Sequence, residues 1–441
     1  QAAHHQPRAQ PRGADMKVHL RMLGCRLNQA EIDMMARQLE QQGHTVVDSA
    51  EQADQVIVNT CAVTNDAVKS GRRLIADLHQ ANRAASITVT GCHAQIAPDQ
   101  IVALPGVTRV VPNDQKDRLV EQLTGQPVEP FDVEPHARSA PQAAWRTRAF
   151  VKVQDGCDNA CTFCITTVAR GRGRSRPADE VIHEVRALHA MGYQEAVLTG
   201  VHLGSYGHDL GDHDGLFHLT QRLLNETDIP RLRLSSLEPW DLSAGFFTLW
   251  ENPRLCPHLH LPLQSGCDAT LRRMRRNTTT RAFQALVEQA RAAIPDVRIT
   301  TDLIVGFPGE TEAEYAESRA FVQAMDFAGI HVFRYSVRAG TPAARMRGQV
   351  AADVKKARSH EMLAIAAAGE ERFARRYLGT TPPVLWENVA GATPEGFINV
   401  GYTHHYLRVQ AVHPRVLTNQ ITPARLAEFR DGLLLGVPVI E

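Results

Sequence analysis

The stretch QDGCDNACTFCITT, residues 154–167, places Cys157, Cys161 and Cys164 at C-x3-C-x2-C spacing. Soft thiolate ligands select zinc, Cu(I) or iron–sulfur clusters, and a structural zinc site normally needs four protein ligands. Three thiolates in a short loop can instead hold three irons of a [4Fe–4S] cluster and leave the fourth iron open to a small molecule. We therefore expect an iron–sulfur site here. The alternatives are an incomplete zinc loop and a structural turn.

One apolar or β-branched segment precedes this loop and five follow it, and helical patterns separate them. They are FVKVQ, EAVLTG, RLRLSS, LHLPLQ, RITTDLIVGF and GIHVFRYS. This alternation predicts a (βα)6 partial barrel over residues 143–375. The cysteine loop directly follows the first of these strands, so we expect it at the carboxyl ends of the strands, where such barrels carry their chemistry.

Residues 16–125 show the same rhythm on a smaller scale. The strand-like segments VHLRML, QVIVN and SITVT alternate with helical patterns, which predicts a doubly wound α/β domain. Cys25, Cys61 and Cys92 each come just after one of these segments. Because the carboxyl ends of parallel strands share one edge of a sheet, we expect these cysteines to converge on a second [4Fe–4S] cluster. The alternative is three separate small core residues.

The remaining segments have simpler interpretations. Residues 1–15 read as a disordered leader with Met16 as a possible start, and the proline-rich residues 126–142 read as a linker. Residues 376–441 contain short strands with turn signals, which predicts a small antiparallel β-barrel. Cys256 and Cys267 lack the strand-end pattern, and we interpret both as structural.

The composition excludes few functions. The 441-residue chain has a formal net charge of zero and 43% hydrophobic residues, which is ordinary for a globular protein of several domains. No run of 18 apolar residues predicts a membrane span, and the first fifteen residues lack the apolar core of a secretory signal. We expect a cytoplasmic protein with no membrane partner and reduced cysteines.

Two arginine-rich segments, RGRGRSR and RRMRR, lie in the predicted partial barrel. Clustered arginines neutralise phosphates, so they favour RNA binding, and the alternative is a solvated surface. In the C-terminal segment Tyr402, Tyr406 and Arg408 either stack on bases or fill the small barrel. The candidate RNA-binding residues of the two segments are Arg170, Arg172, Arg174, Arg176, Arg272, Arg273, Arg275 and Arg276.

The two three-cysteine sets and the C-terminal strands together resemble the radical S-adenosylmethionine (SAM) methylthiotransferases over nearly all of residues 16–441. The segments GCRLNQAE, VNTCAVTN, GCHAQ, VLTGVHLGSYG and TDLIVGFPGET are similar to one branch of that family. That branch adds a methylthio group to C2 of N6-threonylcarbamoyladenosine beside the tRNA anticodon. Sister branches act on isopentenyladenosine in tRNA or on an aspartate of a ribosomal protein. A non-catalytic metal-containing RNA-binding protein is the remaining alternative.

The resemblance implies two [4Fe–4S] clusters and two SAM molecules. One SAM methylates sulfur at the cluster of the N-terminal cysteines, and the other, at the cluster of the loop cysteines, yields the radical that abstracts the C2 hydrogen. Both clusters would face one cavity. The resemblance further implies a C-terminal TRAM domain that binds RNA, a tRNA partner, and an electron-donor protein such as flavodoxin or ferredoxin.

Residues at the ends of the later predicted strands are candidates for SAM contacts. Thr199 and Gly200 would meet the SAM amino group through their backbone, while Gln264 and Asp302 would contact the ribose or the carboxylate. Glu238, in the segment SSLEP, is a further candidate. The alternative for each is a structural polar or turn residue.

Two residues close to the N-terminal cysteines, Asn28 and His93, are candidates for orienting them. The chain also departs from the family pattern after the loop, where Thr167 and Val168 replace an expected Pro–Tyr pair. In the C-terminal segment, His404 and His405 stand where an acidic residue and asparagine are commoner. Both departures leave the cysteines untouched and bear only on substrate contacts.

Overall fold

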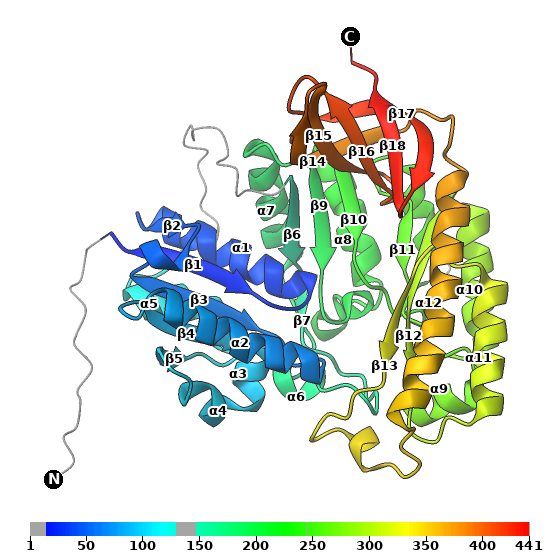
Figure 1. The fold of residues 1–441 in the computed structure, drawn as a ribbon, viewed down its shortest axis with the longest axis horizontal. Helices are drawn as coiled ribbons and strands as arrows, with labels where there is room; N and C mark the ends of the chain where they lie inside the picture. Colours follow the sequence, from blue (N-terminus) through cyan, green and yellow to red (C-terminus); the bar gives the residue numbers. More distant parts are fainter. Residues whose placement is uncertain (1–14, 129–146, 244, 441) are drawn as a thin grey trace. The chain divides into compact units, whose positions relative to one another are not determined.

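The computed structural model describes residues 15–128, 147–243 and 245–440 (Figure 1). Two compact units make up the chain. The first unit comprises Gln1–Asp132 with Val168–Arg170, and the second comprises Val133–Thr167 with Gly171–Glu441. The expected leader, apart from Asp15, and most of the expected linker lie outside the described residues. Within the described residues, no helix has the length and apolar character needed to cross a membrane.

The first unit is a five-stranded, fully parallel sheet with helices on both faces, which confirms the predicted doubly wound fold. One face packs against α1 (Arg26–Gln41) and α5 (Leu119–Thr124), and the other against α2 (Asn65–Ala81), α3 (Cys92–Ile96) and α4 (Pro98–Val102). The strands, in the order β2-β1-β3-β4-β5, are β1 (Lys17–Met22), β2 (Thr45–Val47), β3 (Gln55–Thr60), β4 (Ser86–Gly91) and β5 (Val107–Val110).

The alternation of β3 explains why both faces are covered. Val56 and Val58 pack with α2, whereas Ile57 between them packs with α1 on the opposite face. All three side chains are fully buried. A strand with apolar residues on both sides needs a helix layer on each side, and the sequence supplies both.

The second unit begins with six parallel strands, as the sequence predicts. Two three-stranded sheets, β6-β9-β10 and β11-β12-β13, are joined by isolated parallel bridges between Leu232 and Leu255 and between Ser236 and His260. The strands are β6 (Arg148–Lys152), β9 (Glu195–Thr199), β10 (Arg231–Leu234), β11 (His258–His260), β12 (Arg298–Val305) and β13 (Ile330–Arg334). The short strands β7 (Gln154–Asp155) and β8 (Arg174–Ser175) pair with each other beside the cysteine loop.

Helices cover the outer face of these six strands (Figure 1). Along β12, Ile299, Leu303 and Val305 join the core beneath the helices, so Thr300 and Asp302 point to the opposite, inner face. The helices that contribute to this core are α7 (Ala178–Ala190), α8 (Gly215–Glu226), α10 (Thr280–Ala293), α11 (Glu312–Met325) and α12 (Ala352–Arg375). Two short helices, α6 (Thr166–Arg170) and α9 (Asp268–Met274), lie outside it.

The C-terminal strands close into a five-stranded barrel in the order β14-β15-β16-β18-β17. Four of its five pairings are antiparallel, as predicted, but β16 and β18 pair in parallel. Trp386 fills the barrel core and donates its indole N–H to Thr422 at 2.7 Å. The strands are β14 (Pro383–Thr393), β15 (Gly396–Thr403), β16 (Arg408–His413), β17 (Ile421–Arg430) and β18 (Leu433–Pro438).

Buried arginines at the amino ends of the six parallel strands bind this small barrel. Arg231 donates to the carbonyls of Tyr402 and Pro383 at 3.0 and 2.9 Å, and Arg233 donates to the carbonyl of His404 at 3.0 Å. Glu195, which has no exposed surface, pairs with Arg233 at 2.7 Å. Burial opposes its ionisation, but Arg233 and its neighbours hold the pKa of Glu195 down to about 2.

The two tyrosines considered for base stacking also lie at this junction. Tyr402 and Tyr406 stack on each other with centroids 4.9 Å apart, and the guanidinium of Arg148 lies 4.9 and 5.0 Å from their rings. Burial lowers the pKa of His405 to about 4, so its ring is neutral at pH 7. The structure thus favours a packing role for these side chains over RNA contact.

Candidate metal centres

Cys25, Cys61 and Cys92, the N-terminal cysteine set, lie at the carboxyl ends of the neighbouring strands β1, β3 and β4. Cys61 and Cys92 are each 7% exposed, whereas Cys25 is exposed. Burial, with smaller contributions from the nearby Cys25 and Cys92, raises the pKa of Cys61 to about 11. The structure therefore brings the three thiols together, as expected from strand ends on one edge of a parallel sheet.

A glycine delivers Cys92 to this site. Gly91 has φ +99°, and a Cβ there would lie 2.3 Å from the carbonyl oxygen of Thr60 on the neighbouring strand. Only glycine permits this backbone conformation and this close approach at low cost. The TGC sequence is thus a structural requirement for seating Cys92 beside Cys61.

A buried charged network lies in the same unit. The carboxylate of Glu31, which is not exposed, accepts hydrogen bonds from Lys116 at 2.8 Å, from Arg170 at 2.9 Å and from Asn59 at 2.9 Å. Asn28 accepts from Arg170 at 2.7 Å and donates to the carbonyl of Leu23 at 2.8 Å. The network fixes the start of α1, which directly follows Cys25.

This network contacts the cysteines through Asn28, whose side-chain oxygen lies 3.8 Å from the Cys25 sulfur. Lys116 also lies near Cys92, whose thiolate would favour the charged amine, although burial is the larger effect and lowers the pKa of Lys116. Asn28 was expected from the sequence to orient the cysteines, but Glu31, Lys116 and Asn59 were not. No local signal marks them, because their partners lie far away in the chain.

Cys157, Cys161 and Cys164, the loop cysteine set, are half-buried just after β6 and β7. Their sulfurs accept N–H groups. The backbone amides of Asn159 and Thr166 lie 3.4 Å from the sulfurs of Cys157 and Cys164, and the Cys161 sulfur accepts from Arg276 at 3.7 Å. Hydrogen bonds to the sulfurs are a feature of iron–sulfur ligation and tune its potential.

The spacing of the sulfurs can be compared with what a single zinc ion requires. Thiolates bound to one zinc at about 2.3 Å must lie within roughly 4.6 Å of one another. Among the described residues, neither cysteine set has all its sulfurs within 4.8 Å of one another. Neither set is thus gathered tightly around a single ion in this structure, and a [4Fe–4S] cluster, with one iron per thiolate, does not need the thiolates to be that close.

Arg276 lies at the loop site, whereas the sequence indicated it only as a candidate RNA contact. It is 8% exposed, donates to Glu238 at 2.5 Å and to the carbonyl of Pro262 at 2.6 Å, and lies 4.4 Å from the Trp240 ring. Burial raises the pKa of Cys161 to about 11 even though Arg276 opposes that rise. Arg276 thus supplies a fixed positive charge beside one cysteine of the loop set.

A pocket of about 240 Å³ adjoins the loop, lined by Asn159, His202, Trp240 and Asp241 among others. His202 hydrogen bonds to Asp241, and its ring lies 3.3 Å from the Asn159 amide. Burial opposes protonation of His202, but the hydrogen bonds to Asp241 and Cys157 raise its pKa to about 10. His202 follows a strand end, and this position was the signal that could have identified it.

The five candidates for SAM contacts have different surroundings in the structure. Glu238 is linked to the loop set through Arg276. Arg276 pairs with Glu238 and also donates a hydrogen bond to the Cys161 sulfur. Thr199 is buried, and a Cβ on Gly200 would lie 2.9 Å from the side-chain oxygen of Gln154, so both pack tightly. Gln264, with φ +75°, is held by backbone hydrogen bonds to β12.

Asp302 is the SAM-contact candidate that faces two histidines. It points to the inner face of the six strands and pairs with His260 at 3.3 Å. The role of all five residues in SAM binding therefore remains a prediction, with Glu238 best supported by its position.

Five of the eight candidate RNA-binding arginines pair with carboxylates. Arg170 and Arg276 are buried in the ion pairs described above, Arg176 donates to Glu184 at 2.6 Å, and Arg273 donates to Glu314 at 2.7 Å. A phosphate cannot reach the two buried guanidinium groups, which corrects the expectation for Arg170 and Arg276. The exposed arginines are Arg172, Arg174, Arg272 and Arg275, and of these Arg172 pairs with the exposed Asp158 at 3.2 Å.

The other two cysteines are buried away from both sets. Cys256 and Cys267 are each 1% exposed. Burial raises the pKa of Cys256 to about 11, and the Cys267 thiol donates to Glu317 at 3.2 Å. Both environments suit a structural role.

Comparison with known proteins agrees with this geometry. Residues 17–112 match the uncharacterised protein family UPF0004, and residues 151–322 match the radical SAM superfamily. A radical SAM methyltransferase from Kitasatospora setae, TsrM, solved with cobalamin and a [4Fe–4S] cluster, superposes with a TM-score of 0.56 at 16% identity, covering 75% of this chain and 77% of that one. The superposition supports the fold alone.

Relatives that match over most of their length show the family of this chain. The chain is 36% identical to the threonylcarbamoyladenosine tRNA methylthiotransferase MtaB of Bacillus subtilis, covering 89% of each chain, and 37% identical to MtaB of Thermotoga maritima, covering 90% and 92%. It is 31% identical to a tRNA-2-methylthio-N(6)-dimethylallyladenosine synthase of Akkermansia muciniphila, covering 96% and 98%. Radical SAM enzymes use a [4Fe–4S] cluster and SAM. With both cysteine sets in place, the chain belongs to the radical SAM methylthiotransferase family.

Proposed function

We propose that this enzyme transfers a methylthio group to C2 of N6-threonylcarbamoyladenosine beside the tRNA anticodon, with two [4Fe–4S] clusters and two SAM molecules. The observation that carries the proposal is the convergence of Cys25, Cys61 and Cys92 at neighbouring strand ends, in addition to the loop cysteine set. One cysteine set would hold the cluster for radical formation. A second set would provide a separate site for the sulfur chemistry. The MtaB relatives, at 36% and 37% identity, support the threonylcarbamoyl branch.

The residues of the chain have separate roles in this proposal. Each cysteine set would hold one cluster through three thiolates, and when bound the clusters would supply the electron for SAM cleavage and the site for sulfur transfer. Arg276 holds a positive charge at the Cys161 sulfur, and Glu238 neutralises it on the other side. Asn28 and the Glu31 network hold the start of α1 so that Cys25 stays near Cys61.

The exposed arginines are the proposed contacts for the RNA backbone. Arg172, Arg174, Arg272 and Arg275 lie in segments flanking the loop site and the end of α9. Exposed guanidinium groups bind phosphate without sequence preference, and each contact contributes to the salt dependence of binding. An Arg272→Ala variant should lower the slope of log K against log salt for tRNA by about 0.7–0.9.

A dimethylallyl substrate is the second candidate, favoured by the relative at 31% identity over 96% of the chain. Nucleoside mass spectrometry of tRNA incubated with reconstituted enzyme, SAM, a sulfide source and a reductant such as flavodoxin separates the two. Methylthio product on threonylcarbamoyladenosine alone supports the proposal, and product on the dimethylallyl base alone overturns it. Methylthiolation of a ribosomal protein with tRNA unmodified would likewise overturn it.

Two variants test the division of labour between the cysteine sets. Cys157→Ala should abolish SAM cleavage to 5′-deoxyadenosine, because the loop set would no longer hold its cluster. Cys61→Ala should leave cleavage intact and stop methylthiolation. Continued cleavage in Cys157→Ala, or unchanged methylthio product in Cys61→Ala, would contradict the assigned roles.

A further inference from the structure

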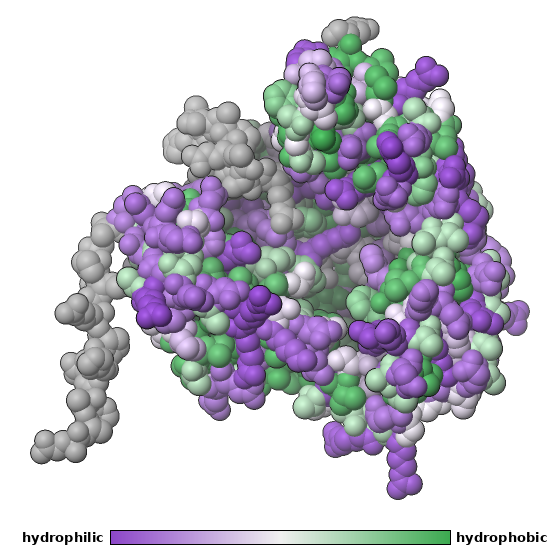
Figure 2. Space-filling model, viewed as in Figure 1, coloured by the Kyte–Doolittle hydropathy of each residue, from purple (hydrophilic) through white to green (hydrophobic). Residues whose placement is uncertain are grey.

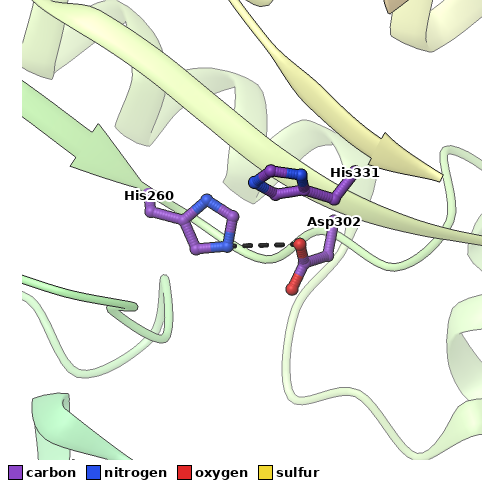
Figure 3. Close-up of side chains that lie close together, drawn as sticks. All are labelled: His260, Asp302 and His331. Atoms are coloured by element: carbon purple, nitrogen blue, oxygen red, sulfur yellow. Dashed lines mark ion pairs between the residues drawn. The ribbon is translucent and has the colours of Figure 1, made fainter. Parts of the chain in front are cut away.

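Two imidazoles and a carboxylate converge on the inner face of the six parallel strands, away from both cysteine sets in sequence. His260 ends β11, Asp302 lies in β12 and His331 lies in β13. Figure 3 shows the three side chains pointing toward one another from adjacent strands. Their ligand atoms all lie within 4.8 Å of one another, which no other trio of histidine, cysteine or acidic residues does in the described part of the chain.

The register of the strands produces this convergence. His260 pairs with Thr300, and Asp302 pairs with His331. Paired residues of parallel strands point to the same face, and Thr300 and Asp302 share a face because side chains alternate along a strand. The trio is therefore built on three rigid strands rather than on loops, which fixes the spacing of its ligand atoms.

The hydrogen bonding of His260 leaves one ring nitrogen directed at Asp302. Thr300 Oγ1 lies 2.9 Å from His260 Nδ1, 3.3 Å from His258 Nε2 and 3.4 Å from the carbonyl oxygen of Leu259. The other ring nitrogen of His260, Nε2, lies 3.3 Å from Asp302 Oδ1. Two such atoms at this distance share either a proton, as in a hydrogen bond, or a metal ion.

The separation of His260 and Asp302 suits two ligands of one metal ion. Zinc binds histidine nitrogen and carboxylate oxygen at about 2.0–2.2 Å, which places two ligands of a tetrahedral site roughly 3.3–3.5 Å apart. The observed 3.3 Å between His260 and Asp302 matches this separation. Thr300 takes the part of the outer hydrogen-bond partner that usually orients a metal-binding histidine.

We propose that His260, Asp302 and His331 bind a divalent transition-metal ion of the Zn²⁺ class, in a site distinct from the two cysteine sets. Three protein ligands leave one tetrahedral position open, as in zinc sites that bind water or a substrate atom. His260 and Asp302 have side chains 13% and 23% exposed and His331 is exposed, so an ion can enter from solvent. The site does not depend on the proposed RNA substrate, and it assigns Asp302 to the metal rather than to SAM.

Zinc retention by the whole chain tests the proposal. The anaerobically reconstituted protein, with both cysteine sets loaded with iron and sulfide, is equilibrated with ZnCl₂ and dialysed against metal-free buffer. Zinc is then counted by mass spectrometry, and its ligands are identified by X-ray absorption at the zinc edge. We expect about one zinc per chain, with nitrogen and oxygen neighbours at about 2.0–2.1 Å and no sulfur at about 2.3 Å.

Variants locate the ion. His331→Ala should reduce zinc retention at least tenfold, and Asp302→Asn, which keeps the side-chain volume, should do the same with an unchanged melting curve. The matched control is His218→Ala, which removes a surface histidine paired with Asp212 at 2.8 Å. Among the residues that the structure describes, no third ligand atom completes a metal-binding group with that pair, so this variant should retain zinc fully. No retained zinc, zinc bound through sulfur, or equal retention in His331→Ala would overturn the proposal.

Discussion

The two cysteine sets are built in different ways. The N-terminal set takes one cysteine from the end of each of three strands, and a buried Glu31–Lys116–Arg170 network lies beside it. The loop set lies within eight consecutive residues, and backbone amides of the same loop approach its sulfurs. The first site therefore depends on the tertiary fold of its unit, whereas the second depends mainly on local loop conformation. Changes in the surrounding structure should affect them separately.

The largest expected effect is from Glu31→Gln. This change leaves the buried cations Lys116 and Arg170 without their carboxylate, and breaking such a buried pair costs about 3–5 kcal/mol. We expect the first unit to unfold at lower urea and the iron content of the N-terminal set to be lost, while loop iron remains. Iron counting and urea unfolding of the first unit measure both.

Glu121→Gln is the control for that variant, because Glu121 pairs with Arg118 on the surface of the same unit at 2.8 Å. Surface pairs contribute little, so neither unfolding nor iron content should change. Loss of iron from both cysteine sets in Glu31→Gln would show that the two sites are not independent, and the comparison would fail.

The second prediction concerns the loop set and Gly156. This residue has φ +71°, and a Cβ there would lie 1.9 Å from the carbonyl oxygen of Arg172. Gly156→Ala must displace the loop, so we expect loss of the loop iron and of SAM cleavage with the first unit unaffected. Gly43→Ala is the control, since Gly43 has φ +82° with nothing within 4 Å of its Cβ position, and it should cost only about 1–2 kcal/mol. Normal loop iron in Gly156→Ala would show that the loop adapts more freely than its contacts indicate.

A smaller effect is expected on the rate of iron uptake. Burial raises the pKa of both Cys61 and Cys161 to about 11, so both are thiols at pH 7, and metal binding requires the thiolate. Uptake should accelerate from pH 7 to pH 9 at both sites, because the thiolate fraction below the pKa rises about tenfold per pH unit. Only Cys161 has Arg276 beside it, which stabilises the thiolate.

Arg276→Gln should therefore slow iron uptake by the loop set a few-fold at pH 7, with the difference shrinking at higher pH. The neighbouring Arg272→Gln, whose parent side chain is exposed, is the matched control and should leave the rate unchanged. Iron bound against time at each pH gives the result. Equal slowing of both sites by Arg276→Gln would contradict a local electrostatic role.

The sequence predicted the fold well because its signals are local. Alternation and β-branched runs predicted all six strands of the partial barrel. The two cysteine sets come after strand ends, as the sequence predicted. The strands β2 and β5 were missed, since they are short and half-exposed edge strands without a clear pattern. The β16–β18 pairing was also missed, because strand direction in a closed barrel depends on non-local register.

The charged side chains could not be assigned from sequence. Arg170 and Arg276 resemble their exposed neighbours in composition, yet each is buried against a carboxylate, Glu31 and Glu238, which lie 139 and 38 residues away. The convergence of His260, Asp302 and His331 likewise depends on the register of three strands. Pairing across such distances is a property of the folded chain, which local patterns do not encode.

Iron and sulfide counting on three proteins tests the central claim that the chain holds two separate clusters. The anaerobically reconstituted parent should bind about eight irons and eight sulfides per chain. A variant with the N-terminal cysteine set changed to alanine, and one with the loop cysteine set changed to alanine, should each bind about four. A parent with about four irons, or with zinc bound through sulfur in place of iron, would contradict the account.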